Sequence, residues 1–289
     1  MRADPVQLLT AAVLAGRPLP PPGGDKEDRG RVCVIGGSAQ VPGAALLAGE
    51  SALRAGAGKL QIISVARVAM PLAIAVPEAL VLGLGADEDG ELAEADPQLD
   101  AVLQDCGAVL IGPGMRATVF LQSLVGRATT ARATVVLDAG ALSEGLPAAR
   151  DGAFVLTPHA GEMAALCGAS KEDIQRSPIQ HAARMAQHTN SVVVLKGAIT
   201  HIVDPQGRSW RHEGGVAGLG TSGSGDVLAG IIAGLAARGA SALDAALWGV
   251  WVHGEAGRQL AGSVGSLGFL ARELAAVVPG ILDRFGAHR

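Results

Sequence analysis

The 289-residue chain contains no tyrosine, and only 2% of its residues are aromatic. Its core must therefore be built from Ala, Val, Leu and Ile, because 49% of the chain is nonetheless apolar. An excess of basic residues is also missing: the formal net charge is -4 and the pI is about 6.0. This charge balance argues against binding to nucleic acid.

An uninterrupted apolar run long enough to cross a membrane is missing as well, because prolines and a glutamate break the segment 68–86. The N-terminal residues also lack the apolar core of a secretory signal. The cysteines show no zinc-ligand spacing, and we expect reduced thiols at Cys33, Cys106 and Cys167. These absences predict a cytoplasmic protein with no membrane partner.

Glycine, in contrast, is abundant, with 41 residues, and four of them lie in the segment 218–226, GLGTSGSGD. The apolar run that begins at Val227 predicts a buried helix, whose N-terminal amides and dipole would attract an anion. A simple turn with a helix cap is the alternative, but a cap needs one hydroxyl or carboxylate and this loop has several. We predict a phosphate site here. Because Asp226 would repel a phosphate, we interpret it as a base beside that ligand.

Short apolar runs followed by polar turns recur along the chain and alternate with helical segments such as 43–55. This alternation predicts an α/β fold with a central, mostly parallel sheet and helices on both faces. Ligands bind such sheets at the carboxyl ends of the strands, where the polar turns fall. The predicted strands are 32–35, 60–65, 109–111, 135–137, 155–156 and 192–195.

Residues 1–16 have helical apolar spacing, and 17–30, rich in proline and charge, predict a linker or a lid. Further along, one helix should end at Gly239, the next should begin at Ser241, and a last helix should span 269–278. No repeat and no later linker divides the chain, so we expect residues 1–289 to form a single domain.

Three polar groups follow predicted strands. His159 and Glu162 either cap a helix or meet a ligand; in the second case His159 is a donor and Glu162 contacts a metal through water. Lys196 is either solvated or a phosphate contact, and Asp138 is either an acid behind the site or a turn residue. His253 is predicted to pack within its helix, and surface or hairpin positions are predicted for His181, His188, His201, His212 and His288.

Six motifs in order resemble those of the ribokinase-like superfamily, and within it those of the NAD(P)H-hydrate dehydratases. The resemblance covers about residues 8–282, and its motifs are VIGGS with PGA at 34–44, IGPG at 111–114, VLDA at 136–139, TPHAGE at 157–162, LKG at 195–197 and GSGDVLAG at 223–230. It implies a ribokinase-like fold and a lyase that repairs hydrated NADH or NADPH. Some relatives are fused to an epimerase domain, for which we find no room here, so a stand-alone form is expected.

The reaction implied by this resemblance uses ADP and Mg²⁺. The nucleotide phosphorylates the hydroxyl of the S-epimer of the hydrate, and phosphate then leaves to regenerate NAD(P)H, with AMP as the second product. Asp226 would activate the hydroxyl while also touching the hydrate. The other hydrate-binding residues would be Ala44, Gly114 and His159. The nucleotide would be bound by Lys196, Gly197, Ala198, Ile199, Thr200, Gly223, Ser224 and Gly225. The family resemblance also suggests a homotetramer.

The chain departs from the family pattern at a few places. A second acid is usual where this chain has Gly140, an Asn is usual near Val216, and a lysine-glycine pair is here Lys26-Glu27. Related kinases usually have Asn in place of His159. A small-molecule kinase acting on a vitamin precursor alcohol and a non-catalytic nucleotide sensor therefore stay as alternatives, and neither ADP over ATP nor NADH over NADPH hydrate is decided.

Overall fold

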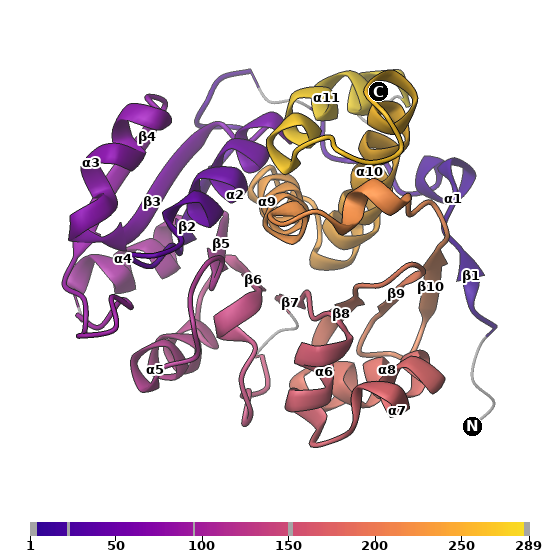
Figure 1. Ribbon diagram of the computed structural model, residues 1–289, viewed down its shortest axis with the longest axis horizontal. Helices are drawn as coiled ribbons and strands as arrows, with labels where there is room; N and C mark the ends of the chain where they lie inside the picture. The colour runs from indigo at the N-terminus through magenta and orange to yellow at the C-terminus, as the bar shows by residue number, and fades with distance from the viewer. Residues whose placement is uncertain (1–4, 22–23, 95, 150–152, 286–289) are drawn as a thin grey trace.

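A computed structural model describes residues 5–21, 24–94, 96–149 and 153–285. These residues form a ten-stranded sheet in the order β1-β10-β9-β8-β7-β6-β5-β2-β3-β4 (Figure 1). Only β9 runs antiparallel to its neighbours. The strands are β1 (Gln7–Leu8), β2 (Arg31–Ile35), β3 (Lys59–Val65), β4 (Ala79–Leu84), β5 (Ala108–Ile111), β6 (Thr134–Leu137), β7 (Phe154–Leu156), β8 (Ser191–Leu195), β9 (Thr200–Val203) and β10 (Ser209–His212).

Helices cover both faces of the sheet, because right-handed crossovers change face where the strand order reverses. One face carries α2 (Pro42–Arg54), α3 (Ala66–Ala75), α9 (Ser224–Ala237), α10 (Ala242–Ser263) and α11 (Ala271–Arg284). The other carries α4 (Pro97–Asp105), α5 (Val119–Ala128), α6 (Ala160–Cys167), α7 (Lys171–Arg176) and α8 (Pro178–Thr189) (Figure 1). The chain also forms α1 (Ala11–Ala15) and the short 3-10 helices η1 (Ala139–Ala141) and η2 (Ala217–Gly220).

Helix α9 is packed unusually close to α2, because glycines face the backbone of its neighbour. A Cβ atom at Gly230 would lie 2.8 Å from the Cα atom of Ala48, and one at Gly234 would lie 2.8 Å from that of Ala52. Nearly the whole of α9 is buried. This close contact fixes the N-terminus of α9 over the centre of the sheet, where α9 also packs against β5 and β6.

The predicted fold class is confirmed, and all six predicted strands are present with bounds that differ by one residue at most. Ser241 caps α10 by accepting a hydrogen bond from the backbone N–H of Asp244, as predicted. The last helix is longer than predicted and ends at Arg284. Helix α9 begins at Ser224, with Gly223 as its N-cap, so Asp226 lies inside the first turn.

The prediction of one helix over residues 1–16 is wrong in part. Gln7 and Leu8 pair with β10 in parallel, and the helix begins only after Thr10, whose side chain caps it. The strand pairing competes with the helical spacing of Leu8 and prevails, because β10 would otherwise be an open edge. Residues 1–4 lie outside the described part of the chain.

The described residues of the segment 17–30, which are 17–21 and 24–30, lie at the end of the sheet opposite the predicted site. Glu27 forms an ion pair with Lys59 at the start of β3, and the carbonyl of Pro20 accepts from Arg238, just after α9. Its described residues therefore do not cover the carboxyl ends of the strands. In the helices that the structure describes, no apolar run is long enough to cross a membrane.

The cysteines are free thiols, with Cys33 and Cys106 buried and Cys167 partly buried. His212 lies in the β9–β10 hairpin, one of the two settings predicted for it, and it is buried there, with 8% of its surface exposed. This burial depends on the fold, which brings Gly254 of α10 against its ring. His288 lies outside the described residues.

Candidate active site

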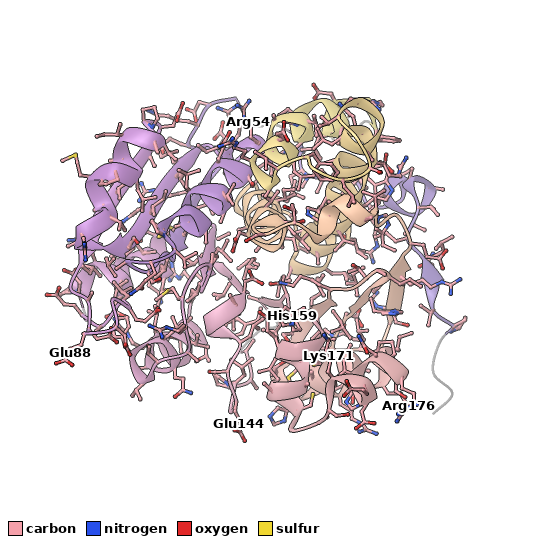
Figure 2. All side chains as sticks on the ribbon, viewed as in Figure 1. Arg54, Glu88, Glu144, His159, Lys171 and Arg176 are labelled. Atoms are coloured by element: carbon pink, nitrogen blue, oxygen red, sulfur yellow. The ribbon has the colours of Figure 1, made fainter. Side chains whose placement is uncertain are left out.

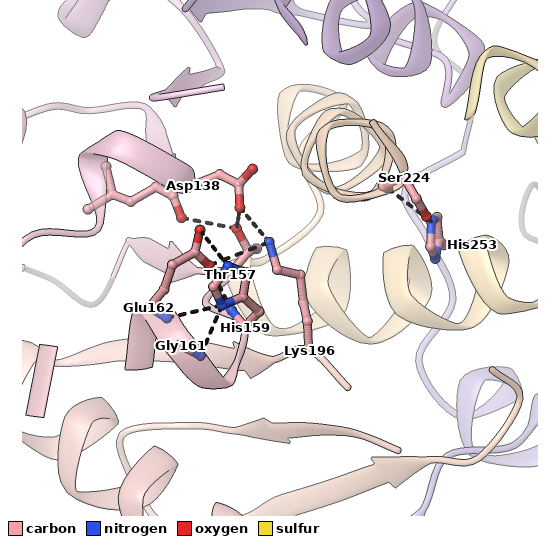
Figure 3. Close-up of polar contacts among 9 residues, drawn as sticks. Asp138, Thr157, His159, Gly161, Glu162, Lys196, Ser224 and His253 are labelled. Atoms are coloured by element: carbon pink, nitrogen blue, oxygen red, sulfur yellow. Dashed lines mark hydrogen bonds and ion pairs between the residues drawn. The ribbon is translucent and has the colours of Figure 1, made fainter. Parts of the chain in front are cut away.

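Three polar side chains meet at the carboxyl ends of β6, β7 and β8. Asp138 follows β6, and its Oδ1 atom accepts hydrogen bonds from Thr157 Oγ1 at 2.7 Å and from Lys196 Nζ at 2.8 Å (Figure 3). Asp138 is almost fully buried, with 2% of its surface exposed. Short buried strands that end in register therefore bring residues 58 positions apart into one hydrogen-bonded cluster.

Lys196 is the cation of this cluster. Burial alone would lower the pKa of its ammonium group, but Asp138, Glu162 and Asp226 outweigh burial and raise it. Glu162 Oε2 lies 3.9 Å from Nζ, and a Cβ atom at Gly225 would lie only 3.3 Å from it. Lys196 therefore keeps its charge and lies directly beside the first turn of α9.

His159 caps α6, and its cap geometry also leaves a donor for a ligand. Its Nδ1 atom accepts from the backbone N–H groups of Gly161 and Glu162, both at 3.0 Å, and Glu162 Oε2 accepts from the N–H of His159 at 2.7 Å. Because Nδ1 accepts, Nε2 carries a proton, and it lies 3.6 Å from Glu162 Oε1. Figure 2 places His159 near the middle of the molecule, whereas Arg176 lies at its periphery. Capping and ligand binding, which the sequence left as alternatives, are thus compatible.

The glycine loop takes the form that an anion site needs. Gly223 has a φ of 89°, in the region that favours glycine, and no side chain caps the N-terminus of α9 that follows it. A Cβ atom at this position would also lie 2.6 Å from Leu47 Cδ1. The N–H of Ser224 donates to the carbonyl of Thr221 at 3.3 Å, and among the described residues no acceptor is found for the N–H groups of Gly225 and Asp226, which can therefore bind an external acceptor.

Asp226 projects from this first turn, and its pKa is raised to about 7. Burial is the main cause, and the negative charges of Asp138 and Glu162 add to it, while Lys196 acts in the opposite direction. A carboxyl group with this pKa exchanges its proton near neutral pH, which suits a general base.

A cavity of about 590 Å³ opens beside these groups. Its wall includes most of the predicted nucleotide residues, together with apolar side chains from η2, α9 and α10. Ile199 is not on this wall and has 44% of its surface exposed, and Gly223 and Asp226 lie beside the wall without forming part of it. The predicted residues on the wall are His159, Lys196, Gly197, Ala198, Thr200, Ser224 and Gly225.

Ala44 and Gly114 lie together, and Gly114 lines a second cavity, of about 480 Å³. A Cβ atom at Gly114 would lie 2.6 Å from that of Ala44, and Gly114 has a φ of 67°. The wall of this cavity includes Glu91, which accepts from both the backbone N–H and the Nε of Arg116. Of the predicted hydrate-binding residues, only Gly114 therefore lines this second cavity.

Four side chains around the two cavities were not predicted as site residues. His212 lines the larger one, and His253, predicted to pack within its helix, lines it as well. Glu91 and Arg116 had no signal at all, because a β-bridge between Ala86 and Leu92 brings Glu91 into the wall. The sequence carries no local pattern that shows which polar side chains such contacts will bring together.

Several carboxylates surround Lys196, but the described residues contain no group of three or more His, Cys, Asp or Glu side chains arranged to hold a metal ion. Glu162 and Asp226 are oxygen donors of the type that Mg²⁺ prefers. Mg²⁺ usually takes one or two carboxylates and completes its shell with water and substrate phosphates. The donor set therefore fits an ion that arrives with a nucleotide better than a resident one.

The family model, the relatives and the solved structure to which this chain is similar all belong to the NAD(P)H-hydrate dehydratases. The model of the NAD(P)H-hydrate dehydratase family matches residues 32–279. An ADP-dependent (S)-NAD(P)H-hydrate dehydratase of Xanthomonas campestris pv. campestris is 57% identical over 98% of this chain and 99% of its own. The enzyme of that name from Bacillus subtilis is 35% identical over 89% of this chain and 90% of its own. A crystal structure of the Bacillus subtilis ADP/ATP-dependent dehydratase, co-crystallised with ATP and Mg²⁺, superposes with a TM-score of 0.86 at 31% identity, covering 98% of this chain and all of the other.

Proposed function

The chain belongs to the NAD(P)H-hydrate dehydratase family, and on this premise we propose that it dehydrates the S-epimer of hydrated NADH or NADPH at the expense of ADP. AMP, phosphate and the repaired NAD(P)H are the products. The observation that carries this proposal is the position of Asp226, a carboxyl group with a pKa of about 7, between a buried cation and an uncapped helix N-terminus.

The nucleotide occupies the larger cavity in this proposal. Its terminal phosphate meets the amides of Gly223 to Gly225 and the ammonium of Lys196, which together offset the charge that develops in transfer. The remaining nucleotide lies along Gly197, Ala198, Ile199 and Thr200. Asp138 supports this site from behind, because its hydrogen bond holds Nζ in place.

Asp226 acts as the base in this scheme. It takes the proton of the substrate hydroxyl as that oxygen forms a bond to the terminal phosphorus of ADP, and the bond from phosphorus to the AMP oxygen breaks. The carbon–oxygen bond of the phosphorylated hydrate then breaks. Phosphate leaves with the bonding electrons, and loss of a proton from the adjacent carbon restores the double bond of the nicotinamide ring.

The hydrate is assigned to the region of Ala44, Gly114 and His159. Gly114 lines the second cavity, and Ala44 packs directly behind it, where a Cβ atom would meet that of Ala44 at 2.6 Å. His159 supplies a neutral Nε2–H donor for an amide carbonyl or a phosphate oxygen. Mg²⁺ would be held by Glu162 through water and by the nucleotide phosphates, and it would supply neutralising charge for phosphoryl transfer.

Purified protein incubated with Mg²⁺, ADP and hydrated NADH tests this function. The proposal expects NADH absorbance to appear with one AMP for each NADH formed. A phosphorylated product that accumulates without elimination would favour the kinase alternative, and nucleotide binding without any turnover would favour the sensor. Parallel assays with ATP and with the hydrate of NADPH decide the preferred donor and substrate.

Three expectations about the whole protein belong to the same proposal: its domain organisation, its location in the cell and its oligomeric state. Residues 1–289 form one domain, which the single continuous sheet supports. The protein works in the cytoplasm, which agrees with free thiols at its three cysteines. It assembles as a homotetramer, an expectation that rests on the family resemblance and that sedimentation analysis would test.

A further inference from the structure

Helices α9 and α10 meet at the wall of the larger cavity through Ser224 and His253. His253 Nε2 lies 3.0 Å from Ser224 Oγ and 3.1 Å from the backbone carbonyl oxygen of the same serine (Figure 3). Both residues line the cavity, next to Gly225. One ring nitrogen therefore contacts two oxygens of a residue in the first turn of α9.

These two distances determine the tautomer of the ring. A carbonyl oxygen can only accept a hydrogen bond, so Nε2 must carry the proton that lies between them. The ring is also neutral, because burial lowers the pKa of His253 to about 4. The protonated Nε2 consequently donates towards both oxygens of Ser224, and Nδ1 carries no proton.

The hydroxyl of Ser224 is constrained by this arrangement. Since its Oγ atom accepts from His253, its own proton is free to donate to another group. Within the part of the chain that the structure describes, Ser224 Oγ has no acceptor of its own. Ser224 has only 4% of its surface exposed and borders the cavity beside Lys196, so this cavity is the place from which an acceptor can reach its hydroxyl.

We propose that His253 is a positioning residue that fixes the Ser224 hydroxyl as a hydrogen-bond donor to the transferable phosphate of the nucleotide. The inference rests on the proposed function, because it assumes that ADP or ATP occupies the larger cavity. His253 itself touches no reacting atom. With the opposite tautomer, the Ser224 hydroxyl would donate its proton to the imidazole and could not donate it to the phosphate.

A double-mutant cycle in the full-length protein tests the pair. Ser224→Ala removes a donor to a charged phosphate and should lower kcat/KM for ADP roughly 10- to 100-fold. His253→Leu should have a similar effect, and the double variant should be no worse than either single variant. His253→Gln keeps an N–H donor and should recover most of the loss, and its folding is checked by circular dichroism. His201→Leu, a partly buried histidine of β9 outside the cavity wall, is the matched control.

Two outcomes would overturn the proposal. Effects that multiply in the double variant would mean that His253 does not act through Ser224. In wild-type protein with ¹⁵N-labelled histidine, the signals that disappear in His253→Gln should show a protonated Nε2, and a protonated Nδ1 would contradict the argument directly.

The failure of the proposed function would look different. Wild-type protein that binds neither ADP nor ATP would overturn both the function and this inference. Wild-type protein that is active but shows no coupling between the two residues would overturn the inference alone.

Discussion

Lys196 and Asp138 form a hydrogen bond of 2.8 Å between Nζ and Oδ1, although 58 positions separate them in the chain. Both also act on Asp226, but with opposite signs: Asp138 raises the pKa of Asp226, and Lys196 lowers it. Burial is the main cause of the raised pKa of Asp226, and this ion pair, which the sheet assembles, adjusts it in both directions.

The first prediction concerns the pH dependence of the reaction. Because a base acts in its deprotonated form, kcat/KM of the wild-type protein should rise with pH through about 7. Lys196→Met removes a positive charge and should move this rise to higher pH, whereas Asp138→Asn removes a negative charge and should move it to lower pH. Profiles measured at constant ionic strength check this. The control is Arg176→Gln, an exposed cation of α7 that should leave the profile in place.

Shifts of both variants in the same direction would contradict this electrostatic account, whatever their effect on the rate.

The second prediction concerns stability. Burial, aided by Asp138, raises the pKa of Asp226 to about 7 from an ordinary value of 3.8, so the folded protein binds this proton more tightly than the unfolded chain does. The stability it contributes is fully present below pH 3.8 and is lost as pH rises through about 7. Asp226→Asn should therefore raise the free energy of unfolding at pH 8 by up to about 4 kcal/mol, and by less at pH 5.

Urea unfolding at the two pH values measures this difference. An equal increase in the free energy of unfolding at both pH values would show that the charged form of Asp226 does not destabilise the folded protein.

The third prediction tests the packing that holds α9 in place. Gly230→Ala would place a methyl group against the backbone of Ala48 and should destabilise the fold by about 1–3 kcal/mol. Gly126→Ala is the matched control, because a Cβ atom there, in α5, meets nothing within 4 Å. That control should be neutral or slightly stabilising, since alanine favours a helix more than glycine does. Thermal unfolding of both variants is the measurement, and equal melting temperatures would refute the close packing.

The fourth prediction separates the two roles of His159. Asparagine is a good N-cap, so His159→Asn should keep α6 capped and leave the melting temperature nearly unchanged. It changes the Nε2–H donor, however, and should raise KM for the hydrate roughly tenfold, about the value of one hydrogen bond. His159→Ala should lose both the cap and the donor. Unchanged KM in the asparagine variant would restrict His159 to its structural role.

The sequence predicted six of the ten strands, because these are short, mostly apolar and followed by polar turns, and it did not predict β1, β4, β9 and β10. That pattern is local, and it survives in β2, β3, β5, β6, β7 and β8. It failed at Leu8, where a helical spacing was overridden by pairing with β10, a contact between residues about two hundred positions apart. Tertiary pairing of this kind leaves no local trace.

In the candidate site too, local patterns were visible in the sequence and tertiary contacts were not. Asp226, Lys196 and His159 were singled out because each follows a predicted strand or begins a predicted helix, and their roles in the site stay predictions. The hydrogen bond from His253 to Ser224 was not found, since a histidine on an apolar helix gives no sign of which oxygen it faces. The pair of Glu91 and Arg116 also depends on a bridge between two loops.

The most direct test of the central claim is the turnover of hydrated NADH with ADP and Mg²⁺ by Asp226→Asn, measured as NADH absorbance and AMP together with the Kd for ADP. If Asp226 is the base, the rate should fall by about 10²- to 10⁴-fold while the Kd for ADP stays within a few-fold of the wild-type value. A variant that retains the wild-type rate would contradict the account.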